Sequence, residues 1–247
     1  MRIDATPLEA IGSAAGAAAH SAHTADRIRV GGLTRLTSID FPGRLAAVVF
    51  CQGCPWRCGY CHNPDLIPAG AATALDWPQV MAFLRTRAGL LDGVVFSGGE
   101  PTLQTALSAA LDETRSLGFE TALHTAGMYP QRLATALPLL DWVGLDIKAP
   151  WSRYAAVSAA RNSAIPVQES LGLLLASGTP HECRTTWHAD LFPVGELVAM
   201  ALDLAERGVR SWALQAGRVG ALAETDLPAD VVRAFQGLFP HFSLRQA

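Results

Sequence analysis

Four of the chain's five cysteines lie within one short run, CQGCPWRCGYCHNP, which begins at Cys51. Within it, Cys54, Cys58 and Cys61 follow the spacing C-x3-C-x2-C. Three thiolates on one loop can each bind one iron of a cubane iron–sulfur cluster, and the fourth iron then stays open to a substrate. The spacing therefore predicts a redox-active [4Fe-4S] cluster that takes part in chemistry.

A zinc site is the alternative interpretation of this loop. The clustered cysteines and His62 could supply the four nitrogen or sulfur ligands that structural zinc needs. Zinc-binding loops commonly separate their ligand pairs by about a dozen residues or more, whereas three residues lie between Cys54 and Cys58. We expect the iron–sulfur cluster. We expect Cys51 to be a buried small residue, with a fourth ligand or a redox role as the alternatives.

The composition narrows the class of protein. The chain has 247 residues, of which 50% are hydrophobic, so it can bury a large core and is long enough for a single α/β barrel. A net charge of −3 gives no reason to expect nucleic acid or an anionic membrane as a partner. No apolar run reaches the roughly 18 residues of a membrane span, and the N-terminus lacks a signal pattern. We therefore expect a cytoplasmic protein, in which clustered cysteines indicate metal or redox chemistry.

Short β-rich runs alternate with helical stretches from residue 28 onward. Residues 1–27 are rich in Ala, Gly, Ser and His without a hydrophobic period, which predicts a disordered extension before one domain over residues 28–247. Six alternations predict parallel βαβ units, arranged as a barrel or as a doubly wound sheet. The expected strands are Ala46–Phe50, Gly93–Ser97, Phe119–His124, Trp142–Ile147, Cys183–Trp187 and Trp212–Gln215. The expected helices are Asp76–Ala88, Leu103–Leu117, Pro130–Leu140, Val167–Ala176, Gly195–Arg207 and Pro228–Leu238.

The positions of the polar residues favour the barrel. They follow the ends of the expected strands, where a parallel barrel carries its active face. Lys148 is the one lysine beside 18 arginines, which suggests that this position needs a compact ammonium group. We therefore predict a single site that gathers these strand ends. After the cysteine loop, they are SGGEP (Ser97–Pro101), His124–Gly127, Asp146 with Lys148, Arg184 with His188, and Gln215.

Each of these groups also has a structural interpretation. The two glycines of SGGEP allow a ligand to approach the backbone closely, but a tight turn would also require them. Asp146 and Lys148 alternate with Ile147, so both point to one side of a strand; a surface ion pair is the alternative. Arg184 could equally be a structural ion-pair partner, and His124 could be a hydrogen-bonded structural histidine.

Taken together, the motifs resemble those of the radical S-adenosylmethionine (SAM) superfamily. The cysteine spacing with an aromatic residue before the last cysteine, followed by GGEP after the next strand, carries this resemblance. Longer segments resemble the activating proteins of anaerobic (class III) ribonucleoside-triphosphate reductase, which are related to the pyruvate formate-lyase activating enzyme. The resemblance covers about residues 30–220. Its segments are GLTRLTSIDFPGRLAAVVFCQGCPWRCGYCHNPDLIP (Gly32–Pro68), VVFSGGEPTLQ (Val94–Gln104), WVGLDIKAP (Trp142–Pro150), CRTTWH (Cys183–His188) and LQAGR (Leu214–Arg218).

The resemblance implies a partial (β/α)6 TIM-like barrel. It implies a [4Fe-4S] cluster on Cys54, Cys58 and Cys61, with SAM on the fourth iron. Reductive cleavage of SAM would then generate a glycyl radical on a partner, anaerobic ribonucleoside-triphosphate reductase, with an electron donor such as flavodoxin. Another glycyl radical enzyme, a small-molecule substrate and a non-catalytic zinc module are the alternatives. The positions implied beside SAM or the cluster are Tyr60, Gly98, Gly99, Glu100, Thr125, Asp146, Lys148 and Arg184.

The chain departs from the family at two strand ends. His124 stands where relatives carry an Asp that, in some of them, helps to bind a monovalent cation beside SAM. The loss of this carboxylate puts such a cation site in doubt. After the sixth expected strand, Gln215, Ala216 and Gly217 replace a Gln-x-Phe pattern and so remove an aromatic wall.

Overall fold

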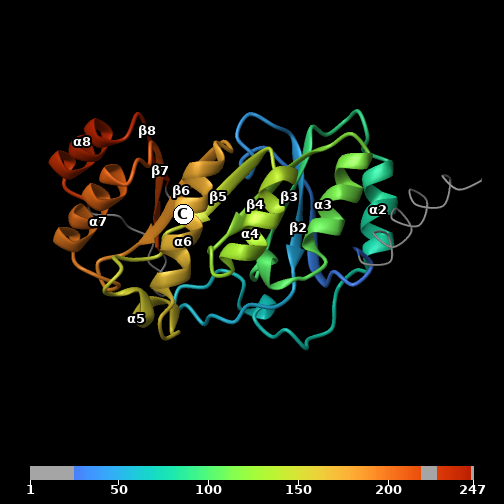
Figure 1. Cartoon of the computed structure of the whole chain (residues 1–247), viewed down its shortest axis with the longest axis horizontal. Helices are drawn as coiled ribbons and strands as arrows, with labels where there is room; N and C mark the ends of the chain where they lie inside the picture. The colour runs from blue at the N-terminus through green and yellow to red at the C-terminus, as the bar shows by residue number, and fades with distance from the viewer. Residues whose placement is uncertain (1–24, 218–226, 246–247) are drawn as a thin grey trace, which may run out of the picture.

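The computed structural model describes residues 25–217 and 227–245, and one sheet of eight strands runs through them (Figure 1). β1 pairs with β2 in the antiparallel sense, and every later neighbour is parallel. The strands are β1 (Val30–Thr37), β2 (Ala46–Cys51), β3 (Gly93–Gly98), β4 (Glu120–Thr125), β5 (Trp142–Asp146), β6 (His181–Trp187), β7 (Ser211–Ala216) and β8 (His241–Arg245).

The helices form a layer against this sheet. Figure 1 shows α2, α3, α4 and α6 in front of the strands. The α-helices are α2 (Trp77–Arg85), α3 (Leu107–Ser116), α4 (Pro130–Ala136), α5 (Tyr154–Ser158), α6 (Ala164–Ser177), α7 (Val194–Glu206) and α8 (Ala229–Leu238). Three short 3-10 helices are η1 (Pro64–Leu66), η2 (Pro101–Leu103) and η3 (Leu137–Leu139).

The strand order decides between the two expected architectures. The sheet runs β1 to β8 in chain order, without the reversal that a doubly wound sheet has at its switch point. Because parallel crossovers share one hand, an unreversed order places all their helices on the same face. β1 and β8 do not pair, so the sheet stays open along one side. This is the expected partial barrel, with two strands more than predicted.

The six expected strands match β2 to β7, and each expected helix is present with shifted ends. The expectation of one helix over Leu103–Leu117 is wrong at its start, because the side chain of Glu100 accepts a hydrogen bond from the Thr102 N–H and caps a separate 3-10 turn. β1, β8 and α5 were not predicted. β1 contains two glycines and two register irregularities, which break its alternating pattern. The expected extension lies outside the described residues up to residue 24; Ala25 is fully buried.

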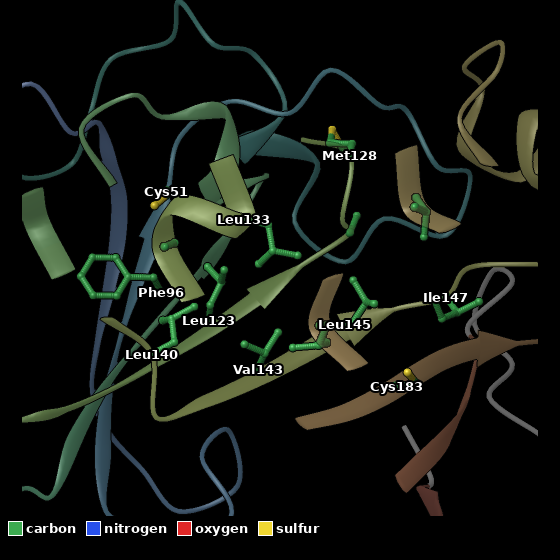
Figure 2. Close-up of a cluster of buried hydrophobic side chains, with 14 of the residues drawn as sticks. Cys51, Phe96, Leu123, Met128, Leu133, Leu140, Val143, Leu145, Ile147 and Cys183 are labelled. Atoms are coloured by element: carbon green, nitrogen blue, oxygen red, sulfur yellow. The ribbon is translucent and has the colours of Figure 1, made fainter. Parts of the chain in front are cut away.

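Two hydrophobic cores hold the sheet from opposite faces. Figure 2 shows the larger one, in which Leu133 of α4 lies over Leu123 of β4 and Val143 of β5. The smaller core fills the lower part of the barrel interior, where Phe41 from the β1–β2 loop packs on Trp142 with ring centroids 6.3 Å apart. The DFPG segment therefore closes the floor of the barrel, at the amino-terminal ends of the parallel strands.

Candidate active site

A cavity of about 210 Å³ opens at the carboxyl ends of the parallel strands. It brings together the cysteine loop and the polar ends of β3 to β7, which the sequence analysis expected to form one site. Its lining includes neither Cys51 nor Glu100, and the expectation that His188 joins the site is wrong, because His188 lies outside this lining and its Nδ1 pairs with Asp190 at 3.4 Å. The lining residues are Cys54, Trp56, Cys58, Tyr60, Cys61, His62, Asn63, Ser97, Gly98, Gly99, His124, Thr125, Ala126, Asp146, Lys148, Arg184, Thr186 and Gln215.

The three spaced cysteines all face this cavity as free thiols. Burial raises the pKa of Cys54 to about 11 and also raises that of Cys58, so both thiols must lose a proton when they bind a metal. Cys51 is fully buried among hydrophobic side chains at the end of β2 (Figure 2), as expected for a small core residue. Cys51 does not line the cavity, and the expectation that it is not a cluster ligand stays a prediction.

A zinc ion and a cubane cluster make different demands on the arrangement of the cysteine donors. Within residues 25–217 and 227–245, no three Cys, His, Asp or Glu side chains gather around a single point, as a mononuclear zinc site requires. A cubane instead gives each thiolate its own iron, so its ligands stand apart around the cluster. Cys54, Cys58 and Cys61 line one cavity, as ligands of a shared cluster would, and their role as its ligands stays a prediction.

Hydrogen bonds join the start of the cysteine loop to the segment that contains η1. Gly53 N–H donates to the carbonyl of Leu66 at 2.7 Å, and Cys54 N–H donates to that of Ile67 at 3.0 Å. The Gln52 amide donates across the loop to the carbonyls of Asp65 and Pro68. These contacts join the two ends of the cysteine loop, residues 52–54 and residues 65–68, so that the loop that carries the thiols is closed at its base.

Gly98 and Gly99 are required by backbone packing. Gly98 has a φ of +111°, and a Cβ there would lie 2.5 Å from the backbone nitrogen of Cys51. A Cβ on Gly99 would lie 2.3 Å from the carbonyl oxygen of Gly53. The close approach that the sequence analysis assigned to a ligand is therefore made first by the cysteine loop itself. Both glycines still contribute backbone to the cavity wall.

Glu100 lies behind that wall and joins β3 to β4. Its buried carboxylate accepts hydrogen bonds from Thr102 N–H at 2.9 Å, Thr125 Oγ1 at 2.7 Å and Ala126 N–H at 2.8 Å. Burial raises its pKa, and these hydrogen bonds oppose the rise. Contact between Glu100 and SAM stays a prediction. In the structure, Glu100 fixes the position of Thr125 and Ala126, which do line the cavity.

Asp146, Lys148 and Arg184 form a charged trio inside the cavity. One carboxylate oxygen of Asp146 accepts from Arg184 at 2.9 and 3.0 Å, and the other accepts from Lys148 Nζ at 3.3 Å. Burial opposes the charged form of Asp146, but Arg184 and Lys148 outweigh it and lower its pKa to about 2. Two cations facing one carboxylate leave the trio with a positive charge, which favours an anionic ligand group.

Tyr60 provides an unused polar group beside this trio. Its hydroxyl oxygen is buried and has no hydrogen-bond partner among the described residues. Lys148 Nζ lies 5.7 Å from the centre of its ring, within the range of a cation–π contact. Burial lowers the pKa of Lys148, but Tyr60 and Asp146 more than compensate, and the net shift is well upward. The lysine is therefore a fixed cation at the cavity wall.

His124 connects the cavity to the barrel floor. Its Nε2 lies 2.8 Å from the carbonyl oxygen of Asp40, and its Nδ1 lies 3.4 Å from Ser97 Oγ. A carbonyl only accepts, so Nε2 carries the proton, and Nδ1 accepts from the serine hydroxyl. Burial and the positive charge of Arg184 lower the pKa of His124 to about 3. The imidazole is neutral and does not replace the charge of the family's Asp.

The sequence matches the description "Radical SAM superfamily" over residues 48–186. The chain belongs to the radical SAM superfamily. Radical SAM enzymes use a [4Fe-4S] cluster and SAM. Cys54, Cys58 and Cys61 line the cavity of this chain, and their role as the cysteine ligands of such a cluster stays a prediction.

Sequence relatives lie among activating enzymes. A protein of Methanocaldococcus jannaschii named as a glycyl-radical enzyme activating enzyme is 29% identical over 167 residues, which cover 64% of this chain and 68% of the relative. The pyruvate formate-lyase-activating enzyme of Clostridium pasteurianum is 36% identical over 125 residues, covering 49% and 52%. The chain therefore spans about half the length of the latter relative.

Solved radical SAM structures share the fold at low sequence identity. QueE from Escherichia coli superposes with a TM-score of 0.55 at 16% identity, covering 89% of this chain and 94% of that protein. Streptococcus suis SuiB bound to S-adenosylmethionine gives a TM-score of 0.56 at 13% identity, covering 78% and 48%. These likenesses establish the partial barrel of this radical SAM protein.

Several residues in or behind the cavity of this radical SAM protein were not predicted from the sequence. Trp56 and Thr186 line the cavity, and Tyr154 holds the backbone at the end of β5. Thr186 follows Arg184 at a spacing of two on β6, so strand alternation alone places it on the same face. The places of Trp56 and Tyr154 depend on the position of α5, which was not predicted.

The described part of the chain contains no helix long and apolar enough to cross a membrane.

Proposed function

We propose that this radical SAM protein is an activating enzyme that generates a glycyl radical on a partner protein. The observation that carries the proposal is the single cavity that joins the three spaced thiols to the Asp146–Lys148–Arg184 trio. The names of its sequence relatives support the activating class.

Cys54, Cys58 and Cys61 would hold the [4Fe-4S] cluster, which would supply the electron for the reductive cleavage of SAM and so the means to remove a hydrogen atom from a backbone glycine of the partner. The chain's own residues bind and orient the reactants. Lys148 and Arg184 provide the positive charge that attracts the carboxylate of SAM, while Asp146 holds both cations in place. The buried hydroxyl of Tyr60 offers a donor to a ligand that fills the cavity.

The partner that we propose is anaerobic ribonucleoside-triphosphate reductase, and the electron donor is a flavodoxin. The DFPG, CHNP and DIKAP segments support this choice of partner, because they carry the closer resemblance within the superfamily. The reaction would take place in the cytoplasm, where reducing conditions preserve cysteine thiolates.

Anaerobic reconstitution tests the proposal directly. The protein is loaded with iron and sulfide, reduced with dithionite and mixed with SAM, and 5′-deoxyadenosine and methionine are measured. We expect both products, and a glycyl radical signal by electron paramagnetic resonance (EPR) when the anaerobic reductase is added. A protein that holds a [4Fe-4S] cluster and yet forms no 5′-deoxyadenosine would refute the assignment.

A small-molecule substrate is the second candidate. The 7-carboxy-7-deazaguanine synthase of Thermococcus kodakarensis is 29% identical over 126 residues, which cover 43% of this chain and 50% of that enzyme. The same reconstituted protein separates the two functions. SAM cleavage that never transfers a radical to any glycyl radical enzyme, together with turnover of a small molecule, would favour this second candidate.

A further inference from the structure

Tyr154 holds the end of β5, although no motif assigns it a role. It begins α5 and is fully buried. Its hydroxyl accepts a hydrogen bond from the Lys148 N–H at 3.0 Å and donates one to the Asp146 carbonyl at 3.2 Å. One hydroxyl therefore bonds the backbone of both charged residues that β5 brings to the cavity.

The ring of Tyr154 contacts the cysteine loop. It meets Trp56 edge to face, with ring centroids 6.0 Å apart at an angle of 71°. At the other end of α5, the Ser158 carbonyl accepts a hydrogen bond from the Arg57 N–H at 3.2 Å. Both contacts fall on residues between the first two cluster cysteines. Helix α5 is thus attached to the cysteine loop and to the end of β5 at the same time.

A third set of contacts anchors Tyr154 to the helix layer. Trp151 stacks on its ring at 5.6 Å and an angle of 19°, and the Trp151 indole N–H donates to Asp203 of α7 at 2.7 Å. Arg207 pairs with Asp203 at 2.7 Å and lies over the Trp151 ring. Tyr154 is therefore packed against side chains of the helix layer as well as against the cysteine loop.

The sheet itself does not fix the distance between the two halves of the site. The cysteine loop follows β2 and the charged pair follows β5, and these strands are separated by β3 and β4. No ladder hydrogen bond joins them. We propose that Tyr154 is a positioning residue that sets Asp146 and Lys148 against the cluster cysteines, so that SAM can contact both at once. This inference rests on the proposed function, because it takes SAM as the ligand.

Tyr154→Phe tests the inference because it removes the hydroxyl and keeps the ring. In the reconstituted protein we expect unchanged iron content and a dissociation constant for SAM that rises about tenfold, as expected for the loss of one or two buried hydrogen bonds. We also expect the change that SAM causes in the EPR spectrum of the reduced cluster to weaken. Thr114→Val is the matched control, since it removes a buried hydroxyl that bonds only to Ala110 within α3.

The outcomes separate this inference from the proposed function. A wild-type protein that holds its cluster and does not bind SAM would refute the proposed function. A Tyr154→Phe protein with the wild-type dissociation constant and EPR change would refute the positioning role alone. If Tyr154→Phe does not fold, Trp151→Phe replaces it, because this variant keeps a stacked ring and loses the bond to Asp203. We then expect a rise of about threefold in the dissociation constant, and no rise would overturn the inference.

Discussion

Replacing Asp146 with Asn should measure how strongly the charged trio is held. The pKa of Asp146 falls from 3.8 to about 2 because Arg184 and Lys148 outweigh burial. Such a fall corresponds to about 2 kcal/mol of stability from the ionised carboxylate. Asn keeps the shape of the side chain and loses the charge. We therefore expect Asp146→Asn to lower the free energy of unfolding by about 2 kcal/mol at pH 7.

The stability that the ionised Asp146 carboxylate provides should depend on pH. Because the pKa in the folded state is depressed, the stabilisation is complete above about pH 5 and is lost as the pH falls toward 2. The difference between the wild type and Asp146→Asn should therefore be constant from pH 5 to 8 and fall to roughly half at pH 3.

Urea unfolding of the cluster-free protein measures this difference at each pH. Asp190→Asn is the control, because the Asp190 side chain is 70% exposed and pairs only with His188, so we expect almost no change. Equal stability of the wild type and Asp146→Asn at pH 7 would refute the reasoning. A difference that does not shrink at acid pH would refute it as well.

Three further predictions concern the cluster loop and the cations. Cys51→Ala should keep its iron and Cys58→Ala should lose it; loss in both, by anaerobic iron analysis, would disprove the three-ligand assignment. Gly99→Ala should cost about 1–3 kcal/mol and reduce cluster loading, because its Cβ would overlap the cysteine-loop backbone. The control Gly70→Ala has open space outside the cysteine motif and should change neither the melting temperature nor the iron content. Replacing potassium with tetramethylammonium should leave SAM cleavage unchanged, since both oxygens of Asp146 already bind side-chain cations; a large fall in rate would contradict this.

The repeated alternation of strand and helix made most of the fold predictable. β2, β3, β5 and β7 are short, mainly apolar runs bounded by turn residues, which is a local signal that one sequence contains. β8 lies at the open edge of the sheet and is only partly buried, so its sequence, HFSLR, shows no continuous apolar run. Helix α5 has five residues and no capping hydrogen bond, and its position depends on tertiary contacts.

The sequence located the site more reliably than it explained individual residues. The rule that active residues follow parallel strands brought the cysteine loop, Asp146 and Arg184 to one place. It did not distinguish a residue that faces the cavity from one that supports the wall. Glu100 follows a strand as Asp146 does, but its carboxylate bonds to Thr125 and its neighbours behind the wall. That distinction depends on which donors reach the carboxylate, and two of them, Thr125 and Ala126, come from the end of β4.

The DFPG segment has a structural role at the floor of the barrel. Phe41 fills the interior from below, and the carbonyl of Asp40 holds His124, whose other nitrogen faces Ser97 at the cavity wall. The loop between β1 and β2 therefore supports His124 from the end of the barrel opposite the proposed SAM site. Substitutions in it would reduce activity in a genetic screen without touching SAM, the cluster or a partner. A map of inactivating mutations would therefore show two separate patches, one at each end of the barrel, for a protein with a single active site.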